Sequence, residues 1–200
     1  NRPDGPRFAG RRDGHAVSRC GANQVCLFAG WGGGGIPLSS NQLGTWRLEN
    51  GRVVFDSWQD LTPYTTARHE QKVVCAYGQC VSAGGATDGD GQLTMNTVAI
   101  LSLDPSAQNP VWVPAPSFSQ GRRAQMFNIY HDLVLQLGGH TGQVWLTDVQ
   151  TARITGPRMI GPLSATGLTL PLPLGAGVVV VGPTAVAMTA VALSPDAGVR

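Results

Sequence analysis

The sequence predicts an all-β fold in which one antiparallel sheet unit recurs along the chain. Short hydrophobic segments closed by glycine return at intervals, and each is preceded by a hairpin pattern. Composition agrees, because 27 of the 200 residues are glycine, 14 are proline and only 13% are charged. Such a chain is rich in turns and buried strands, whereas disordered chains need high charge and low hydrophobicity. One domain is the default for this length.

Four glycines anchor the repeat by closing a hydrophobic run in each unit: Gly30, Gly84, Gly138 and Gly182. Successive anchors are 54, 54 and 44 residues apart. Four units of this length, made of short β-rich segments, are typical of the blades of a β-propeller. The units are expected near 10–64, 65–118, 119–160 and 161–200, with 1–9 as the outer strand of a preceding or closing blade.

Each unit predicts its strands in the same order. A hairpin comes first, over 15–30, 71–85, 126–139 and 168–182. A variable loop and a third strand follow, over 45–49, 98–104, 144–149 and 186–193. A fourth strand carries Trp58 in the first unit and Trp112 in the second. We therefore expect four-stranded antiparallel blades.

The flanking motifs resemble the kelch family, in which an Arg-x-x-His-like start leads to a hydrophobic hairpin that ends in a di-glycine. The matching pairs are RRDGH (11–15) with FAGW (28–31) and RHEQ (68–71) with SAGG (82–85), joined by LQLGGH (135–140). The last unit departs from the pattern with Gly182-Pro183. The resemblance covers nearly the whole chain and implies a kelch-type propeller of four-stranded blades around a central channel. Because kelch propellers usually have more than four blades, it favours part of a larger propeller over a closed four-bladed ring.

The glycines at the hairpin ends are expected to be structural: Gly30, Gly84, Gly85, Gly138, Gly139 and Gly182. A strand must turn sharply there, and glycine accepts positive φ and close backbone approach. Residues 30–35 also fit the dinucleotide fingerprint G-x-G-x-x-G. That function requires a helix to begin at the glycines, and 36–46 has no helical periodicity, so the sequence favours a scaffold.

Two disulfides are predicted, each within one hairpin. A two-residue turn at Tyr77-Gly78 places Cys75 opposite Cys80 in a non-hydrogen-bonded pair, with Cα atoms roughly 4.5 Å apart. That spacing lies within the range of about 4.4–6.8 Å for a disulfide. Cys20 and Cys26 are expected at the same place in the first unit. The later units have apolar pairs there, Ile129 with Val134 and Pro173 with Val178.

The cysteines also give an indication of the protein's cellular location and of whether it binds a metal ion. Disulfides imply a secreted or cell-surface protein, whereas the alternative is four reduced, buried cysteines in a cytoplasmic propeller. A zinc site is disfavoured, because C-x4-C and C-x5-C are unusual ligand spacings and the two pairs belong to different blades.

The C-terminal region contains an uncharged stretch, 160–195. Within it, 177–193 is near the lower limit of the roughly 17–25 residues of a membrane span, and Gly182-Pro183 interrupts it. The repeat places this stretch on the hairpin and third strand of a blade. We therefore expect strands and no membrane span.

No catalytic residue, cofactor or metal is assigned. His15 and His69 are expected to hold turns at the repeat starts, and His131 to lie in an exposed turn. Extracellular kelch-like copper oxidases use two histidines and two tyrosines, one of them cross-linked to cysteine. Tyr64, Tyr77 and Tyr130 do not reproduce that pattern. The DGDG segment (88–91) lacks the further oxygens of a calcium loop.

The leading functional hypothesis is a non-enzymatic protein-interaction or structural module, extracellular or at the cell surface and part of a larger assembly. It would bind a protein partner or itself. A formal charge of +2 without a basic patch argues against nucleic acid. The alternatives are a fragment of a secreted, oxidase-like propeller enzyme, a carbohydrate-binding protein with a glycan partner, and a cytoplasmic adaptor. Candidate partner-binding residues lie in or beside the post-glycine loops: Trp31, Asp88, Asp90, Met95 and His140.

Overall fold

The computed structural model describes residues 9–104, 110–156, 159–160, 164–165, 168–171, 177–181 and 189–192, with side chains to Ile154. Within these residues the fold is all-β and every strand pairing is antiparallel. One short 3-10 turn, Gly33–Gly35, interrupts the strands. The predicted strand over 1–9 lies outside the described residues except for Ala9.

The strands form successive sheets in chain order. The first contains β1 (Ala16–Gly21), β2 (Gln24–Trp31), β3 (Pro37–Glu49) and β4 (Arg52–Leu61). The second contains β5 (Lys72–Ala76), β6 (Gln79–Ala83), β7 (Val98–Ser102) and β8 (Trp112–Ala115). The third contains β9 (Met126–Tyr130), β10 (Leu133–His140), β11 (Trp145–Gly156) and β12 (Met159–Ile160), with β13 (Ser164–Ala165) paired to β11. Each of the first three predicted units therefore contains four antiparallel strands that pair in chain order.

The C-terminal stretch forms a three-stranded sheet of β14 (Leu168–Pro171), β15 (Gly177–Val181) and β16 (Thr189–Ala192). The prediction of strands in 177–193 is confirmed at β15 and β16. No helix among the described residues is long and apolar enough to cross a membrane. Val178 pairs with Pro171, so the expected pair with Pro173, which is outside the described residues, is wrong. Gly182 is also outside them.

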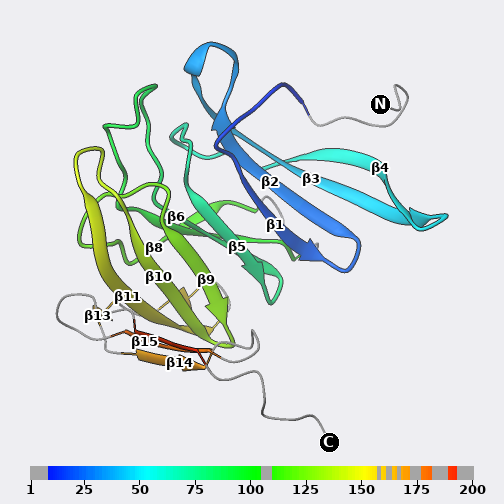
Figure 1. Ribbon diagram of the computed structural model, residues 1–200. Helices are drawn as coiled ribbons and strands as arrows, with labels where there is room; N and C mark the ends of the chain where they lie inside the picture. The colour runs from blue at the N-terminus through cyan, green and yellow to red at the C-terminus, as the bar shows by residue number, and fades with distance from the viewer. Residues whose placement is uncertain are drawn as a thin grey trace, which may run out of the picture.

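The first strands of consecutive sheets are neighbours. β1 packs beside β5, and β5 beside β9 (Figure 1). Two apolar clusters fill the spaces between the sheets: Phe28, Leu43, Cys80 and Leu101 belong to the first, Val81, Ile100, Phe127 and Val134 to the second. Because successive strand residues point to opposite faces, Cys80 and Val81 serve different clusters. The second sheet is thus covered on both faces.

The glycine closure recurs with the same backbone conformation in three units. The first position of the pair is Ala29, Gly84 or Gly138, with φ of 45°, 62° and 55°. The second is Gly30, Gly85 or Gly139, with φ of 106°, 104° and 110°. The alignment of Gly30 with Gly84 and Gly138 is therefore wrong by one residue. Gly30 corresponds structurally to Gly85 and Gly139.

Buried polar side chains connect each closure to the next unit. Gln71 donates through Nε2 to the Phe28 carbonyl at 2.8 Å, and Gln125 donates in the same way to the Ala83 carbonyl at 2.8 Å. The backbone adds a second bond, because the Gly30 and Gly85 amides donate to the Arg68 and Arg122 carbonyls at 3.0 and 2.8 Å. The second strands of the first two sheets, β2 and β6, therefore end in hydrogen bonds to the following unit.

Three arginines hold the same closures from within their own units. Arg12, Arg68 and Arg122 donate through Nη1 to the carbonyls of Ala29, Gly84 and Gly138. Reciprocal backbone bonds join Asp13 with Trp31, His69 with Ala86, and Arg123 with His140. His69 thus corresponds to Asp13 and Arg123, and His15 to Gln71 and Gln125.

The second hairpin has the predicted register, because Cys75 pairs with Cys80 and Ala76 with Gln79. Tyr77 and Gly78 both have positive φ, as a two-residue hairpin turn of type I′ requires. In the third unit Ile129 pairs with Val134, as predicted.

The first hairpin differs from the second. A bulge lies between Arg19 and Gly21, and Ser18 is opposite Cys26, so Cys20 does not occupy the place of Cys75. Both predicted disulfides are nevertheless present, Cys20–Cys26 with Cα atoms 5.9 Å apart and Cys75–Cys80 with Cα atoms 4.0 Å apart. A bulge adds one unpaired residue, and a disulfide tolerates the resulting longer Cα separation.

Replacing Gly85 by alanine is expected to lower the free energy of unfolding by about 2–4 kcal/mol. A Cβ at Gly85 would lie 3.0 Å from both the Gln71 Cβ and the His69 carbonyl oxygen, at a φ that alanine disfavours. Gly33→Ala is the matched control, because its Cβ would point into open space and should change stability by less than about 0.5 kcal/mol. Urea denaturation measures both. Equal effects would contradict the assigned closure.

Candidate functional site

Three loops that follow the glycine closures gather on one side of the molecule, at the top of Figure 1. They span 31–36, 86–97 and 140–145, and we call their combined surface the loop face. Thr94 Oγ1 donates to the Thr141 carbonyl at 3.1 Å. The loop backbones also approach one another closely. A Cβ added to Gly142 would lie 2.5 Å from the Gln92 carbonyl oxygen, and a Cβ added to Gly89 would lie 3.2 Å from the Gly35 carbonyl oxygen. The loops are therefore in contact in chain order.

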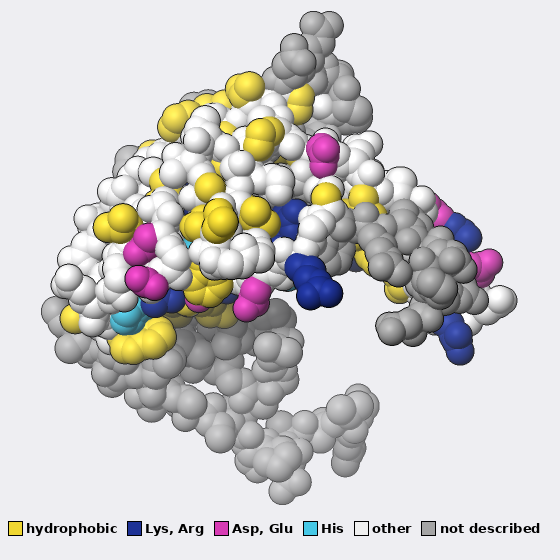
Figure 2. All heavy atoms as spheres, turned by 90° about the horizontal axis from the view of Figure 1, so that it is seen from above, with side chains coloured by type: hydrophobic (Ala, Val, Ile, Leu, Met, Phe, Trp, Pro, Cys, Tyr) yellow, Lys and Arg dark blue, Asp and Glu magenta, His cyan; other side chains and the backbone are white. Residues whose placement is uncertain are grey.

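Each loop of this face presents a large apolar side chain to solvent. Ile36 and Leu93 are each 64% exposed, Val144 is 57% exposed and Trp145 is 74% exposed. Figure 2 looks down on this face, where hydrophobic side chains stand among mostly uncharged surface. Single exposed apolar residues are ordinary on protein surfaces, but one on each of three contiguous loops indicates an interaction site.

Trp31, a predicted binding residue, lies at the end of β2 and packs inward. Its ring stacks on His69 with centroids 3.8 Å apart. The His69 Nε2 in turn is 2.8 Å from the Asp88 carbonyl oxygen. The role predicted for His69, holding a turn, is confirmed, and Trp31 serves mainly to cover it.

The predicted acidic residues have different environments. The Asp88 carboxylate accepts hydrogen bonds from the backbone amides of Gln92 and Leu93 at 3.0 Å each. Slight burial opposes ionisation, but these bonds and nearby His69 lower the pKa of Asp88 below its usual value. Asp88 therefore closes its own loop, whereas the side chain of Asp90 is exposed at the loop tip.

Met95 and His140 complete the predicted binding set. The Met95 backbone bonds to both the Gly85 carbonyl and the Arg122 amide. His140 accepts a hydrogen bond through Nδ1 from the Gly142 amide at 3.0 Å, and its ring meets Trp145 edge-on with centroids 4.7 Å apart. Both residues are half-buried, so their main contribution is to hold the loops in place, and they offer little surface to a partner.

The remaining histidines do not join this site. Burial, followed by the charge of Arg12, lowers the pKa of His15. Its Nδ1 forms no hydrogen bond to a described residue, but a hydrogen bond with the Arg12 backbone opposes the lowering of its pKa. The turn-holding role of His15 stays a prediction. His131 is exposed in the β9–β10 turn with a φ of 52°, as expected.

A polar groove adjoins the loop face along β11. Its volume is about 630 Å³, and its lining includes Ser119, Trp145, Asp148 and Gln150. Arg122 is fully buried beside it and forms a bidentate pair with Asp148 at 2.8 and 2.9 Å. Burial opposes ionisation of Asp148, but hydrogen bonds from Arg122 and Gln150 prevail and lower its pKa.

Among the described side chains, one group of three His, Cys, Asp or Glu residues is close enough to share a metal ion: Cys26, Cys75 and Cys80. All four cysteines are disulfide-bonded. The Tyr64 hydroxyl is buried and bonds to Ser82 Oγ at 2.8 Å, and burial raises the pKa of its phenol.

The exposed apolar residues of the loop face were missed by sequence reasoning. Val144 and Trp145 begin the predicted third strand of their unit, whereas Ile36 and Leu93 stand beside glycine, proline or polar residues in segments outside the predicted strands. That setting is a usable signal, because apolar side chains in turn-rich segments have no sheet face to pack on. The candidate binding residues named from the sequence lie in or beside the same three loops, and their binding role stays a prediction.

Comparisons with known proteins give a fold likeness alone. No family model matches the chain, and no curated protein matches it. The solved structure of YjhT is similar, with a TM-score of 0.59 and 16% sequence identity over 80% of this chain. The chain spans about half of YjhT, 47% of its length.

Replacing Asp148 by asparagine is expected to lower the free energy of unfolding at pH 7 by about 1.5–3 kcal/mol, because buried Arg122 loses its countercharge. The pKa of Asp148 is lower in the folded state. Its stabilisation is therefore present above the unfolded pKa of about 3.9 and is lost as pH falls through the folded pKa.

Urea denaturation at pH 7 and near pH 3 measures this effect. The stability difference between wild type and Asp148→Asn should shrink at the lower pH. A difference that stays constant over this range would show that the carboxylate charge is not what stabilises Arg122.

Proposed function

We propose that the chain supplies blades of a kelch-type β-propeller and acts as a non-enzymatic interaction module that binds a protein partner through the loop face. The observation that carries the proposal is the exposed apolar side chain on each of three contiguous loops. Protein interfaces are depleted of charge at their centre and enriched in aromatic residues, and hot spots often centre on tryptophan. Trp145 provides such an anchor.

The repeated geometry supports the propeller. Three units share the glycine closure and the arginine contact, and the closures of the first two are hydrogen-bonded to the following unit. Their first strands lie side by side, as blades around an axis require. The likeness to the structure of YjhT supports the arrangement of the antiparallel sheets on which the proposal depends.

The two disulfides support an extracellular or cell-surface location, because such bonds persist in oxidising compartments. A protein partner, or a second copy of the chain, fits a loop face that exposes apolar side chains. The low net charge of +2 makes electrostatic recruitment of a polyanion a poor fit.

A carbohydrate ligand is the second candidate, and the groove along β11 favours it. Exposed Trp145 borders the groove, and Asp148, Gln150 and Ser119 offer polar atoms within it. An apolar ring beside a few convergent polar groups is a common ligand-site composition. This candidate requires Trp145 and the groove, whereas the protein partner requires all three loops.

The deciding experiment combines Ile36→Ser, Leu93→Ser and Trp145→Ser in one loop-face variant. The matched control carries Leu48→Ser, Val53→Ser and Tyr77→Ser, which remove equally exposed apolar groups at other hairpin ends. Affinity capture followed by cross-linking should recover a protein with wild type and the control but not with the loop-face variant. Circular dichroism and thermal unfolding check that both variants keep the fold.

Recovery of the same proteins by all three forms would contradict the proposed surface. Binding of a glycan that is lost in Trp145→Ser alone, with no protein captured, would favour the second candidate. Stoichiometric copper and oxidase activity in the intact protein would overturn the non-enzymatic assignment.

A further inference from the structure

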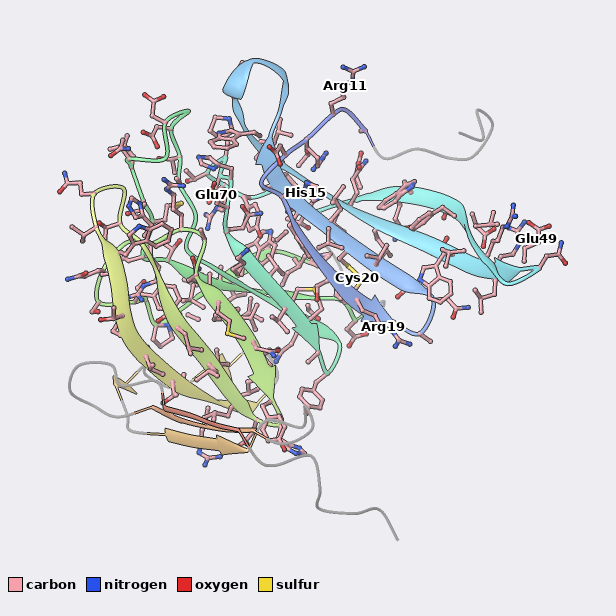
Figure 3. The ribbon with its side chains drawn as sticks, viewed as in Figure 1. Arg11, His15, Arg19, Cys20, Glu49 and Glu70 are labelled. Atoms are coloured by element: carbon pink, nitrogen blue, oxygen red, sulfur yellow. A yellow bond between two sulfur atoms is a disulfide. The ribbon has the colours of Figure 1, made fainter. Side chains whose placement is uncertain are left out.

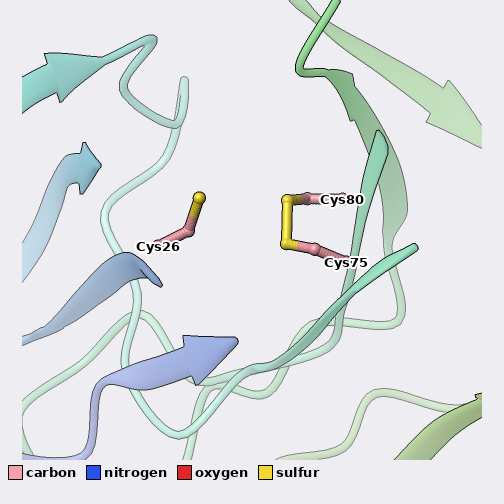
Figure 4. Close-up of side chains that lie close together, drawn as sticks. All are labelled: Cys26, Cys75 and Cys80. Carbon is pink, nitrogen blue, oxygen red and sulfur yellow. A yellow bond between two sulfur atoms is a disulfide. The ribbon is translucent and has the colours of Figure 1, made fainter. Parts of the chain in front are cut away.

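The two disulfides belong to different sheets, yet their sulfur atoms meet. Sγ of Cys26, from β2, lies within 4.8 Å of Sγ of Cys75 and Cys80, from β5 and β6 (Figure 4). Cys26 and Cys80 are fully buried between the sheets. The two cysteine pairs therefore belong to different units, as the sequence predicts, and still lie close together in space.

A groove gives solvent access to the other side of this sulfur cluster. It has a volume of about 380 Å³ and lies between the first two hairpin turns, with Arg19, Cys20, Cys75 and Tyr77 among its lining residues. Arg19 and Cys20 lie near the end of β1 in Figure 3. The Cys75 amide donates to Ser18 Oγ at 2.9 Å, which holds the hairpins together beside the groove.

We propose that the two disulfides form one exchange-coupled redox site, entered through this groove by an anionic low-molecular-weight thiol. Its thiolate attacks Sγ of Cys20. A bond forms between the entering sulfur and Cys20, the Cys20–Cys26 bond breaks, and its electron pair leaves on Cys26 as a thiolate. The released thiolate is already within 4.8 Å of the second disulfide.

The next two steps return the entering thiol. Cys26 attacks Cys80, so a Cys26–Cys80 bond forms and Cys75 leaves as a thiolate in the groove. Cys75 then attacks Cys20 in the mixed disulfide, which forms Cys20–Cys75 and releases the thiol. No electrons are consumed, and two bonds within hairpins become two bonds between sheets. The thiol acts as a catalyst of isomerisation.

The groove gives the thiol access to one disulfide, and the sulfur cluster provides a second disulfide that can accept the released thiolate. Exchange needs access to one sulfur of a disulfide and a nearby acceptor for the thiolate released. Cys20 and Cys75 are half-exposed and provide access, whereas buried Cys26 and Cys80 cannot be alkylated without opening. The guanidinium of Arg19 at the groove attracts an anionic thiol.

The consequence is a covalent link between the first two sheets. In the native pairing, hydrogen bonds and packing alone hold β1 and β2 against β5 and β6 among the described residues. At the next interface the third sheet has Ile129 and Val134 in the corresponding hairpin positions, so the exchange is confined to one pair of sheets. A thiol-rich environment would thus tighten one interface without net reduction.

Cys20→Ser tests the step assigned to Cys26. The variant leaves a Cys26 thiol beside the intact Cys75–Cys80 bond. After incubation near pH 8.5, where thiolate is available, followed by denaturation in N-ethylmaleimide, non-reducing peptide mapping should find a disulfide containing Cys26 and Cys75 or Cys80 as the main product. Recovery of alkylated Cys26 with Cys75–Cys80 intact would overturn the proposal.

Cys26→Ser is the matched control, because it also leaves one thiol but removes the sulfur at the centre of the cluster. Only a trace of disulfide between the hairpins is expected, with Cys20 alkylated. Equal exchange in both variants would overturn the role of Cys26. Wild type with catalytic reduced glutathione gives a readout that needs no variant to fold: peptides joined through Cys26–Cys80 should accumulate, and unchanged pairing would contradict the proposal.

Discussion

The structure depends on hydrogen bonding of buried backbone where the second strands of the first two sheets, β2 and β6, end. At this point the chain turns away between two sheets, so its amide and carbonyl groups lose water and require protein partners. The following unit supplies them, from the glutamine side chains of Gln71 and Gln125 and the backbone carbonyls of Arg68 and Arg122. A unit alone therefore has an unsatisfied edge, and a neighbour completes it. This requirement explains why the units follow one another in contact.

The glycine pair and the loop face follow from the same constraint. The next unit leaves no room for a Cβ at Gly84, which would lie 2.4 Å from the Arg122 carbonyl oxygen, and the start of its own unit crowds each of Gly30, Gly85 and Gly139. Because each closure points its chain to the same side, the loops after it collect there. Their backbones contact one another, which leaves the apolar side chains of Ile36, Leu93 and Trp145 directed to solvent. The scaffold thus fixes where a partner can bind, while the loop residues determine which partner.

The sequence was sufficient for the all-β class, the strand order within units, the register of the second hairpin and both disulfides. It failed where local irregularity shifts positions by one residue. Ala29 adopts a φ of 45° where the other units have glycine, so matching by glycine alone misaligned Gly30. The bulge at Cys20 likewise displaced a predicted pair. The exposure of Leu93 and the burial of Trp31 depend on contacts between neighbouring units, and the sequence of one repeat alone does not reveal these contacts. The propeller and its partner stay predictions.

Native-state hydrogen exchange at the Gly30 and Gly85 amides tests the central constraint most directly. These two N–H groups donate to carbonyls of the following unit. If the units depend on one another, both amides should exchange only through large-scale unfolding, as slowly as amides in the centre of β6. Exchange at the rate of an unprotected amide, in protein whose β6 amides are protected, would contradict the account.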